Sequence, residues 1–185
     1  TSFHDHLLEK TLLTRKNPKE IVYDVDFLES ILCLQIGNKI LDQCCGNGII
    51  SLELARRGYW VEGVDLTHQY IQTAQKNAAR GNYNASFVCS DAGKYTSTNC
   101  DAVFNWWTGF GYFDDDDQNK ALIASAFQSL RSGGLYLLDV PNYNGVIRHF
   151  KPVMVDSYQT DIGLIELTRH TEFNVYRGRM EKIWE

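Results

Sequence analysis

Carboxylate side chains stand at the ends of three short apolar segments, beside a pair of glycines. Asp42 lies in KILDQC, Asp65 ends YWVEGVD, and Asp91 follows ASFVCS. Gly46 and Gly48 come directly after the first segment, where they let the backbone approach a ligand while the next helix presents its free N–H groups. A carboxylate at a strand end can accept hydrogen bonds from ribose hydroxyls or from an exocyclic amine. Together these residues predict a nucleotide-binding site.

Each of these residues also has a purely structural interpretation. Asp42 could orient the amides of a turn, Asp65 could cap the helix that begins at Thr67, and Asp91 could be an ordinary turn residue. A glycine pair alone is weak evidence, because glycine turns are common. The combination of three acidic residues at three successive strand ends with a glycine loop is what favours ligand binding.

Aromatic residues dominate the segment that follows the apolar run over 100–105. The run ends at Asn105 and is followed by Trp106 and Trp107, and we expect these three residues to close the floor of the site. Tyr112 comes soon after. Exposed aromatic residues in a loop at a sheet edge could hold an apolar substrate, and a ring face attracts a cation. The alternative is that most of these rings belong to the hydrophobic core.

Short strands separated by helices must position these residues. The strand segments are short apolar runs that alternate with helices, which is typical of parallel strands with helices on both faces. We expect strands over 39–44, 59–64, 85–89, 100–105 and 135–140, and helices before Gly37 and over 49–57, 67–80 and 114–130. Apolar periodicity in the last helix selects one inward face: Leu122, Ile123, Ala126, Phe127 and Leu130.

The character of the sequence changes after Pro141. The segments 153–158, 163–174 and 179–184 have strand composition and no long helix between them, which predicts an antiparallel meander. We therefore expect a single domain in three parts: a helical segment over 1–36, a core over 37–141, and a β layer over 142–185. The fifth strand would remain an exposed edge, which allows pairing into a homodimer.

Composition argues against several function classes. The chain of 185 residues has a net charge of -5 with scattered Lys and Arg, so nucleic-acid binding is not expected. No apolar run approaches the roughly 20 residues of a membrane span, and the N-terminus does not resemble a signal peptide, so we expect a cytoplasmic protein without membrane contact. The five cysteines form no CxxC pair, and the acidic run 114–117 is typical of a helix N-terminus. Neither a disulfide framework nor a metal site is expected.

Five segments resemble, in order, the motifs of the class I S-adenosylmethionine (SAM)-dependent methyltransferases. ILDQCCGNG is similar to the SAM-binding motif, VEGVDLT to the second motif, and FVCSDAG to the adenine-binding motif. LRSGGLYLLDV resembles the turn and fifth strand, and NWWTGFGYF resembles a motif of one small-molecule branch, usually written SFGYF. The resemblance implies an α/β fold with a Rossmann-like parallel sheet and helices on both faces. The chain would then lack the last two strands of the full methyltransferase sheet or use the C-terminal antiparallel β meander in their place. The resemblance also implies that the segments 1–36 and 142–185 form lids, the second of them over the methyl acceptor.

By this resemblance, residues at the strand ends surround SAM. Asp65 binds the ribose, Leu66 flanks the adenine, Asp91 and Ala92 meet its amine and ring, and Asn105 lies near the methionine amino group. The product would be S-adenosyl-L-homocysteine. The expected cofactor-binding residues are Asp42, Cys44, Cys45, Gly46, Gly48, Asp65, Leu66, Asp91, Ala92, Asn105, Trp106, Arg15 and Tyr23.

One position departs from the family pattern. The first glycine of D-x-G-x-G-x-G is Cys44 here, so its side chain is expected to point away from the ligand. On the acceptor side, the aromatic loop after 100–105 makes Tyr112 a candidate for catalytic contacts, and the resemblance adds His149 from the segment after the fifth strand. The resemblance also implies that Arg15 or Tyr23 reaches the methionine carboxylate from the N-terminal lid.

The leading hypothesis is a methyltransferase that acts on an N, O or C atom of a small molecule, mainly through alignment and exclusion of water. A nicotinamide-dependent dehydrogenase would use a similar sheet. However, its fingerprint places the first glycine at the strand end without Asp42 and has no role for Asp91. A third hypothesis is a non-catalytic SAM-fold module that binds a partner chain.

Overall fold

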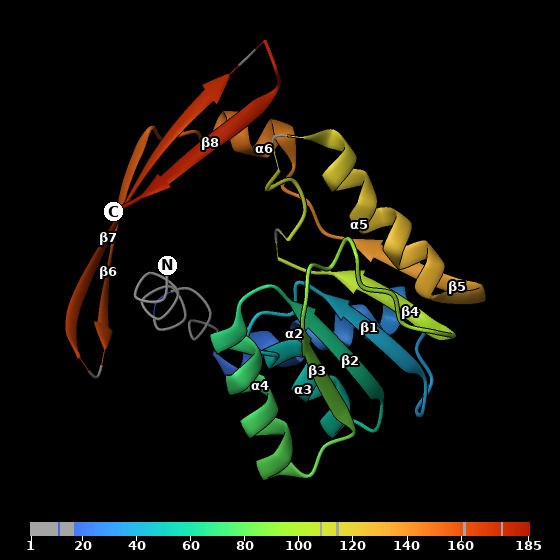
Figure 1. Cartoon of the computed structure of the whole chain (residues 1–185). Coiled ribbons are helices and arrows are strands. Elements are labelled where there is room, and N and C mark those ends of the chain that lie inside the picture. The colour runs from blue at the N-terminus through green and yellow to red at the C-terminus, as the bar shows by residue number, and fades with distance from the viewer. Residues whose placement is uncertain (1–10, 12–16, 108, 114, 161, 175) are drawn as a thin grey trace.

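Five parallel strands form the centre of the computed structural model, which describes residues 11, 17–107, 109–113, 115–160, 162–174 and 176–185 (Figure 1). The strand order is β3-β2-β1-β4-β5, and every neighbouring pair is parallel. This confirms the predicted parallel α/β sheet. The strands are β1 (Lys39–Gln43), β2 (Trp60–Asp65), β3 (Ala85–Cys89), β4 (Cys100–Asn105) and β5 (Leu130–Leu138).

Helices cover both faces of this sheet, as the short apolar runs predicted. One face packs against α2, α3 and α4 through two clusters of buried apolar side chains. The opposite face packs against α5 around the buried side chains of Leu41, Val103 and Leu122. The helices are α2 (Pro18–Ile31), α3 (Ile49–Arg56), α4 (His68–Gly81) and α5 (Asp116–Ser129).

The orientation of α5 corrects one prediction. Ile123 and Phe127 were expected to face inward, but both are exposed, and Phe127 is 78% accessible. The helix instead buries Ser125, whose hydroxyl donates to the Ala92 carbonyl at 2.6 Å and accepts from the Gln43 amide nitrogen at 2.8 Å. Hydrogen bonds to the neighbouring strand and loop therefore determine which face of α5 points toward the sheet, and apolar periodicity alone does not.

Strand β5 begins earlier than expected. The prediction placed a turn at Gly133 and Gly134, but both glycines lie inside the strand, where the register with β4 shifts. Gly133 has a φ of +77°, and a Cβ on Gly134 would lie 3.0 Å from the Cys100 carbonyl oxygen. The two glycines thus form a bulge that only residues without a side chain fit easily.

The C-terminal residues form a second sheet that arches away from the first (Figure 1). It contains β6 (Val153–Thr160), β7 (Gly163–Asn174) and β8 (Arg179–Trp184), paired antiparallel in that order. The predicted meander is confirmed, and among the described residues no strand pairs with the outer edge of β5. A short helix that the sequence analysis did not predict, α6 (Tyr143–Arg148), connects the two sheets.

No helix in the described part of the chain is long and apolar enough to cross a membrane. All five cysteines are free thiols. Asp115 caps the N-terminus of α5 by accepting from the Asp117 amide at 2.9 Å, in line with the helix-start interpretation of the acidic run.

Candidate functional site

A pocket opens at the carboxyl end of β1, where the chain turns into α3. Strand β1 lies between β2 and β4, so chain connections leave it toward opposite sides of the sheet. Crevices at such switch points bind ligands in open α/β sheets. The pocket is lined by Asp42, Cys44, Cys45, Gly46, Asn47, Ile49, Ile50, Trp106 and Trp107.

Asp42 lies at the base of this pocket and is 3% exposed. The Ser51 hydroxyl of α3 donates to its carboxyl Oδ2 at 2.5 Å. Burial raises the pKa of Asp42 to about 8, the nearby Asp65 carboxylate adds to the increase, and the Ser51 hydrogen bond opposes it. A cation bound beside Asp42 would favour its ionised form and lower this pKa.

Asp65 connects the loops that follow β1 and β2. Its Oδ2 accepts from the Gly46 amide at 2.9 Å, and its Oδ1 accepts from the Thr67 amide at 2.8 Å. The second bond reaches the amide of Thr67, which is itself the N-cap of α4, so in the described structure Asp65 orients the entry to the helix and does not cap its first-turn amides. The first bond holds the glycine loop beside the carboxylate. Capping alone does not explain that bond.

Cys44 adopts the backbone conformation that the family pattern gives to a glycine. Its φ is +60°, close to the +56° of Gly46, so the loop keeps a left-handed turn despite the side chain. The Cys44 sulfur lies 3.6 Å from the Asn105 amide nitrogen and 3.8 Å from the Gly109 carbonyl oxygen. The thiol is thus directed toward the β4 side of the pocket, and burial raises its pKa to about 12.

Asp91 and Leu66 lie at the ends of the neighbouring strands. The Asp91 carboxylate accepts from the Gly93 amide at 2.9 Å and from the Lys94 ammonium at 3.3 Å. The Ser90 amide donates to the Asp65 carbonyl at 3.0 Å, which brings the two strand ends together. Leu66 is 70% exposed. Ala92 is buried and packs against the sheet with the α5 cluster.

Two buried polar atoms beside the pocket have no hydrogen-bond partner in the described structure. They are Asn105 Oδ1 at the end of β4 and Trp106 Nε1 in the following loop. The Trp106 ring packs against Phe27 of α2, with 5.7 Å between centroids. Leaving such groups unpaired costs about 1–3 kcal/mol each, so a ligand with complementary groups gains by pairing them.

Several predicted site residues that the structure describes are not among those that line this pocket: Gly48, Asp65, Leu66, Asp91, Ala92, Asn105, Tyr112, Tyr23 and His149. Tyr112 is 78% exposed, Tyr23 of α2 is also exposed, and His149 is exposed at the C-terminal end of α6. Arg15 lies outside the described residues. Conversely, the cofactor-binding set omitted the pocket residues Asn47, Ile49, Ile50 and Trp107. Asn47 lies between Gly46 and Gly48, and Ile49 and Ile50 directly follow the glycine loop, so their positions could have indicated them.

Comparison with known proteins agrees with this arrangement. The sequence profile of a family described as "Methyltransferase domain" matches residues 40–134. A ubiquinone biosynthesis O-methyltransferase from Idiomarina loihiensis is 28% identical over 118 residues, covering 64% of this chain and 48% of that protein. The chain spans about half the length of the curated relatives it matches.

Solved methyltransferase structures have the same fold at low sequence identity. A SAM-dependent methyltransferase from Clostridium acetobutylicum superposes with a TM-score of 0.72 at 15% identity, covering 100% of this chain and 78% of that one. SAM-bound CalS10, an amino pentose methyltransferase from Micromonospora echinaspora, superposes with a TM-score of 0.68 at 16% identity, covering 93% and 76%. The chain therefore belongs to the methyltransferase-domain family and has the fold of the class I SAM-dependent methyltransferases.

Proposed function

We propose that this protein binds SAM in the β1 pocket and transfers its methyl group to a small-molecule acceptor. The observation that carries this proposal is the layout of the pocket. The glycine loop forms one wall, Trp106 and Trp107 form another, and the buried Asp42 lies at the base. Family membership supports the same assignment.

The adenosine half of SAM would lie across the ends of β2 and β3. Each oxygen of the Asp65 carboxylate accepts one backbone amide and keeps a further lone pair for a ribose hydroxyl. The exposed Leu66 offers an apolar surface to the adenine ring. Asp91 and Ala92 lie at the next strand end, where the carboxylate can accept from the adenine amine.

The methionine half would lie over β1 and β4. Asn105 Oδ1 could accept from the methionine ammonium, and Trp106 Nε1 could donate to its carboxylate, which would pair both buried atoms. Asp42 would be drawn to its ionised form by the positive charge of the ligand. In this arrangement the glycine loop binds through its backbone, so the Cys44 side chain need not touch the cofactor.

Methyl transfer is a displacement at the methyl carbon. A lone pair on the acceptor atom forms the new bond, the carbon–sulfur bond breaks, and S-adenosyl-L-homocysteine leaves with the electron pair. An acceptor that carries a proton on the attacking atom loses it to a base or to water. Alignment of the two reactants can contribute on the order of 7–11 kcal/mol, so the reaction does not require a dedicated base.

Tyr112 and His149 are the residues we assign to the acceptor side. Both are exposed, and they belong to the segments that follow β4 and β5, at the edge of the sheet where the pocket opens. A phenol and an imidazole could orient the acceptor or take its proton. Replacement of either residue is expected to reduce methyl transfer more than it reduces SAM binding.

A calorimetric titration of the protein with SAM, S-adenosyl-L-homocysteine and NAD tests the proposal. We expect saturable binding of both sulfur compounds and none of NAD. Binding of NAD alone would support the dehydrogenase alternative. Binding of SAM without methyl transfer to a panel of small amines, phenols and carboxylates would support a non-catalytic module instead.

A further inference from the structure

The chain turns sharply where β4 ends and one wall of the pocket begins. Trp107 has a φ of +61°, in the left-handed region that a bulky aromatic residue rarely adopts. Its ring lines the β1 pocket together with that of Trp106, and both rings pack against the buried apolar cluster between the sheet and α2. Such a backbone conformation persists only where the surrounding structure holds it. The contacts of this turn therefore show what places the Trp107 ring in the pocket wall.

Asp139 holds this turn through two hydrogen bonds. It directly follows β5, which pairs parallel with β4 as far as Asn105 and Leu138. The Asp139 amide donates to the Asn105 carbonyl at 2.9 Å, and the Asp139 Oδ2 accepts from the Trp107 amide at 3.1 Å. We call these two bonds the Asp139 clasp. One is made by the main chain of Asp139 and the other by its side chain.

The side-chain bond of the clasp replaces one that a regular sheet would supply. In a parallel ladder, the amide of Trp107 would donate to the main-chain carbonyl of Asp139. The carboxylate accepts this amide instead, which lets the chain leave the sheet at Trp107 without losing a partner for its N–H group. A residue without a side-chain acceptor at position 139 would leave this part-buried amide unpaired.

The turn is packed closely on its other side, toward β1. A Cβ on Gly109 would lie 2.7 Å from Asn105 Oδ1 and 2.7 Å from the Cys44 Cβ, so the chain returns directly over the end of β4. A shift of the turn in this direction would press it into the fully buried Asn105. The clasp lies on the β5 side and opposes a shift the other way.

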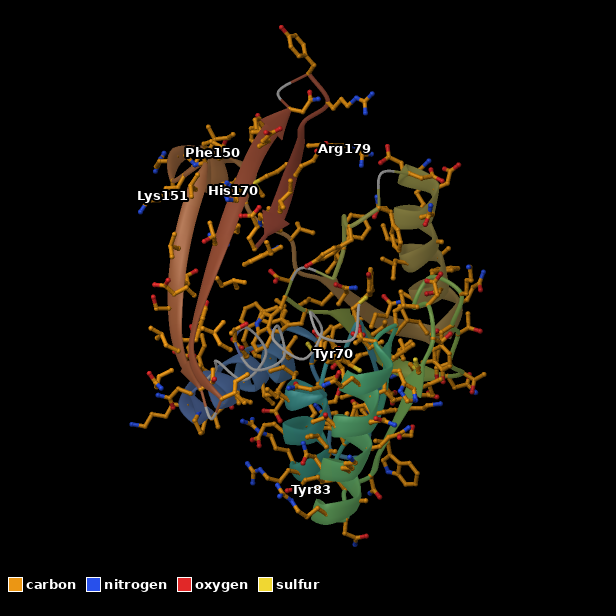
Figure 2. All side chains as sticks on the ribbon, turned by 60° about the vertical axis from the view of Figure 1, so that its left-hand side comes forward. Tyr70, Tyr83, Phe150, Lys151, His170 and Arg179 are labelled. Atoms are coloured by element: carbon orange, nitrogen blue, oxygen red, sulfur yellow. The ribbon has the colours of Figure 1, made fainter. Side chains whose placement is uncertain are left out.

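The segment between β4 and α5 has a separate anchor at its far end. Arg179, at the start of β8, donates to the Phe113 carbonyl at 2.9 Å. Figure 2 shows Arg179 between the antiparallel sheet and α5. The residues of the pocket wall lie at the near end of the segment, where the Asp139 clasp holds the chain.

We propose that Asp139 is a positioning residue for the SAM pocket and that it acts through Trp107. This role rests on the proposed function. The carboxylate does not have to touch SAM, because it fixes the left-handed turn that keeps the Trp107 ring in the pocket wall. Small displacements of the groups that position a ligand reduce binding and rate sharply. The hydrogen-bond geometry of Asp139 provides this role, and its negative charge does not.

Calorimetric titration of position-139 variants with S-adenosyl-L-homocysteine separates geometry from charge. Asp139→Ala should raise the dissociation constant about tenfold, because the turn loses its side-chain bond. Asp139→Asn keeps an oxygen that can accept the Trp107 amide and should stay within about threefold of the wild type. Asp139→Glu keeps the charge but moves the carboxylate by one methylene, so it should weaken binding nearly as much as alanine does. The reverse order, with Asp139→Asn weak and Asp139→Glu close to the wild type, would overturn the proposal.

Trp107→Gly tests whether Asp139 acts through Trp107. Glycine adopts a φ of +61° without strain and has no ring to place, so the clasp has no further effect on the pocket wall. Adding Asp139→Ala to Trp107→Gly should change the affinity by less than about twofold. A further tenfold loss in the double variant would show that Asp139 acts independently of Trp107, which contradicts the proposal. This comparison also decides the matter if Asp139→Ala alone does not fold, because glycine removes the strain.

Asp101→Ala is the matched control. The Asp101 carboxylate also accepts a backbone amide of a neighbouring strand, that of Lys39 at 2.7 Å, but at the opposite end of β4. This variant should lower the free energy of unfolding and leave the affinity for S-adenosyl-L-homocysteine unchanged. An equal loss of affinity in Asp101→Ala would mean that such carboxylates act only through the stability of the fold, and would overturn the positioning role. No binding by the wild type contradicts the proposed function and this role with it, whereas wild-type affinity in Asp139→Ala overturns the role alone.

Discussion

Ser51 and Asp42 form a hydrogen-bonded pair of 2.5 Å beneath the glycine loop, and both side chains are buried. Ser51 comes from α3 and Asp42 from β1, so the bond connects the helix to the strand end that it follows. The pair places an ionisable group where water has little access. Its protonation should therefore be visible in the stability of the fold.

Stability should depend on pH through Asp42. Its pKa is raised from 3.8 to about 8, so the folded state holds a proton that the unfolded state has lost over this range. The stabilising contribution of Asp42 to the free energy of unfolding is fully present below about pH 4 and is lost as pH rises toward 8. Over this range the free energy of unfolding falls by up to about 1.4 kcal/mol per pH unit. Urea unfolding of wild type and Asp42→Asn from pH 5 to 8 measures it. The wild type should lose stability relative to the variant, and parallel profiles would contradict this.

Because the backbone at Cys44 is left-handed, the fold should tolerate glycine at this position better than a β-branched residue. Cys44→Gly should change the free energy of unfolding by no more than about 1 kcal/mol, because relief of strain offsets the greater entropy of the unfolded chain. Cys44→Val places a β-branched side chain at a φ of +60° and should cost about 2 kcal/mol. Chemical denaturation of the two variants gives the comparison. Equal stabilities of the two variants would show that this backbone conformation is not strained.

The hydroxyl of Ser125 should contribute to the stability of the fold. Ser125→Ala removes its bonds to Ala92 and Gln43 and leaves buried polar groups unpaired, at a cost of about 1–3 kcal/mol. Ser132→Ala, at an exposed position of β5, should change stability by less than about 0.5 kcal/mol. Thermal unfolding distinguishes the two, and an unaffected Ser125→Ala would mean that apolar packing alone orients α5.

Some parts of this fold can be predicted from the sequence and others cannot. Strands β1 to β4 are short segments rich in apolar residues, so both the strands and the strand-end positions of Asp42 and Asp65 were predictable. The face of α5 was not, because it depends on hydrogen bonds between Ser125 and residues far away in the sequence. The six-residue α6 was missed because it is too short to show periodicity.

The candidate site was predictable to the same extent. Local pattern indicated the glycine loop and the acidic residues, since each lies at a fixed place relative to a strand end. It did not indicate that Asp65 reaches across to the Gly46 amide, or that Asn105 Oδ1 and Trp106 Nε1 are left unpaired. Those relationships depend on which strands become neighbours in the sheet.

The exposed edge of β5 predicts self-association. Phe127 and Ile123 of the neighbouring α5 are exposed and lie one helical turn apart, and in the described structure no strand covers the outer edge of β5. We expect light scattering to detect a homodimer in a concentration series. Phe127→Ser should shift it toward monomer, whereas Tyr176→Ser, at an exposed turn far along the chain, should not. A wild type that remains monomeric at all concentrations would contradict this prediction.

The most direct test of the central claim is the affinity of S-adenosyl-L-homocysteine for the wild type and for Asp65→Ala, measured by calorimetry. Asp117→Ala, which removes an exposed carboxylate on α5, is the control. Asp65→Asn, which can still accept the Gly46 amide, separates loop disorder from loss of the charge. We predict that Asp65→Ala weakens binding about tenfold or more, that Asp65→Asn weakens it less, and that Asp117→Ala matches the wild type. Unchanged affinity in a folded Asp65→Ala protein, or no binding by the wild type, would contradict a SAM site at the end of β1.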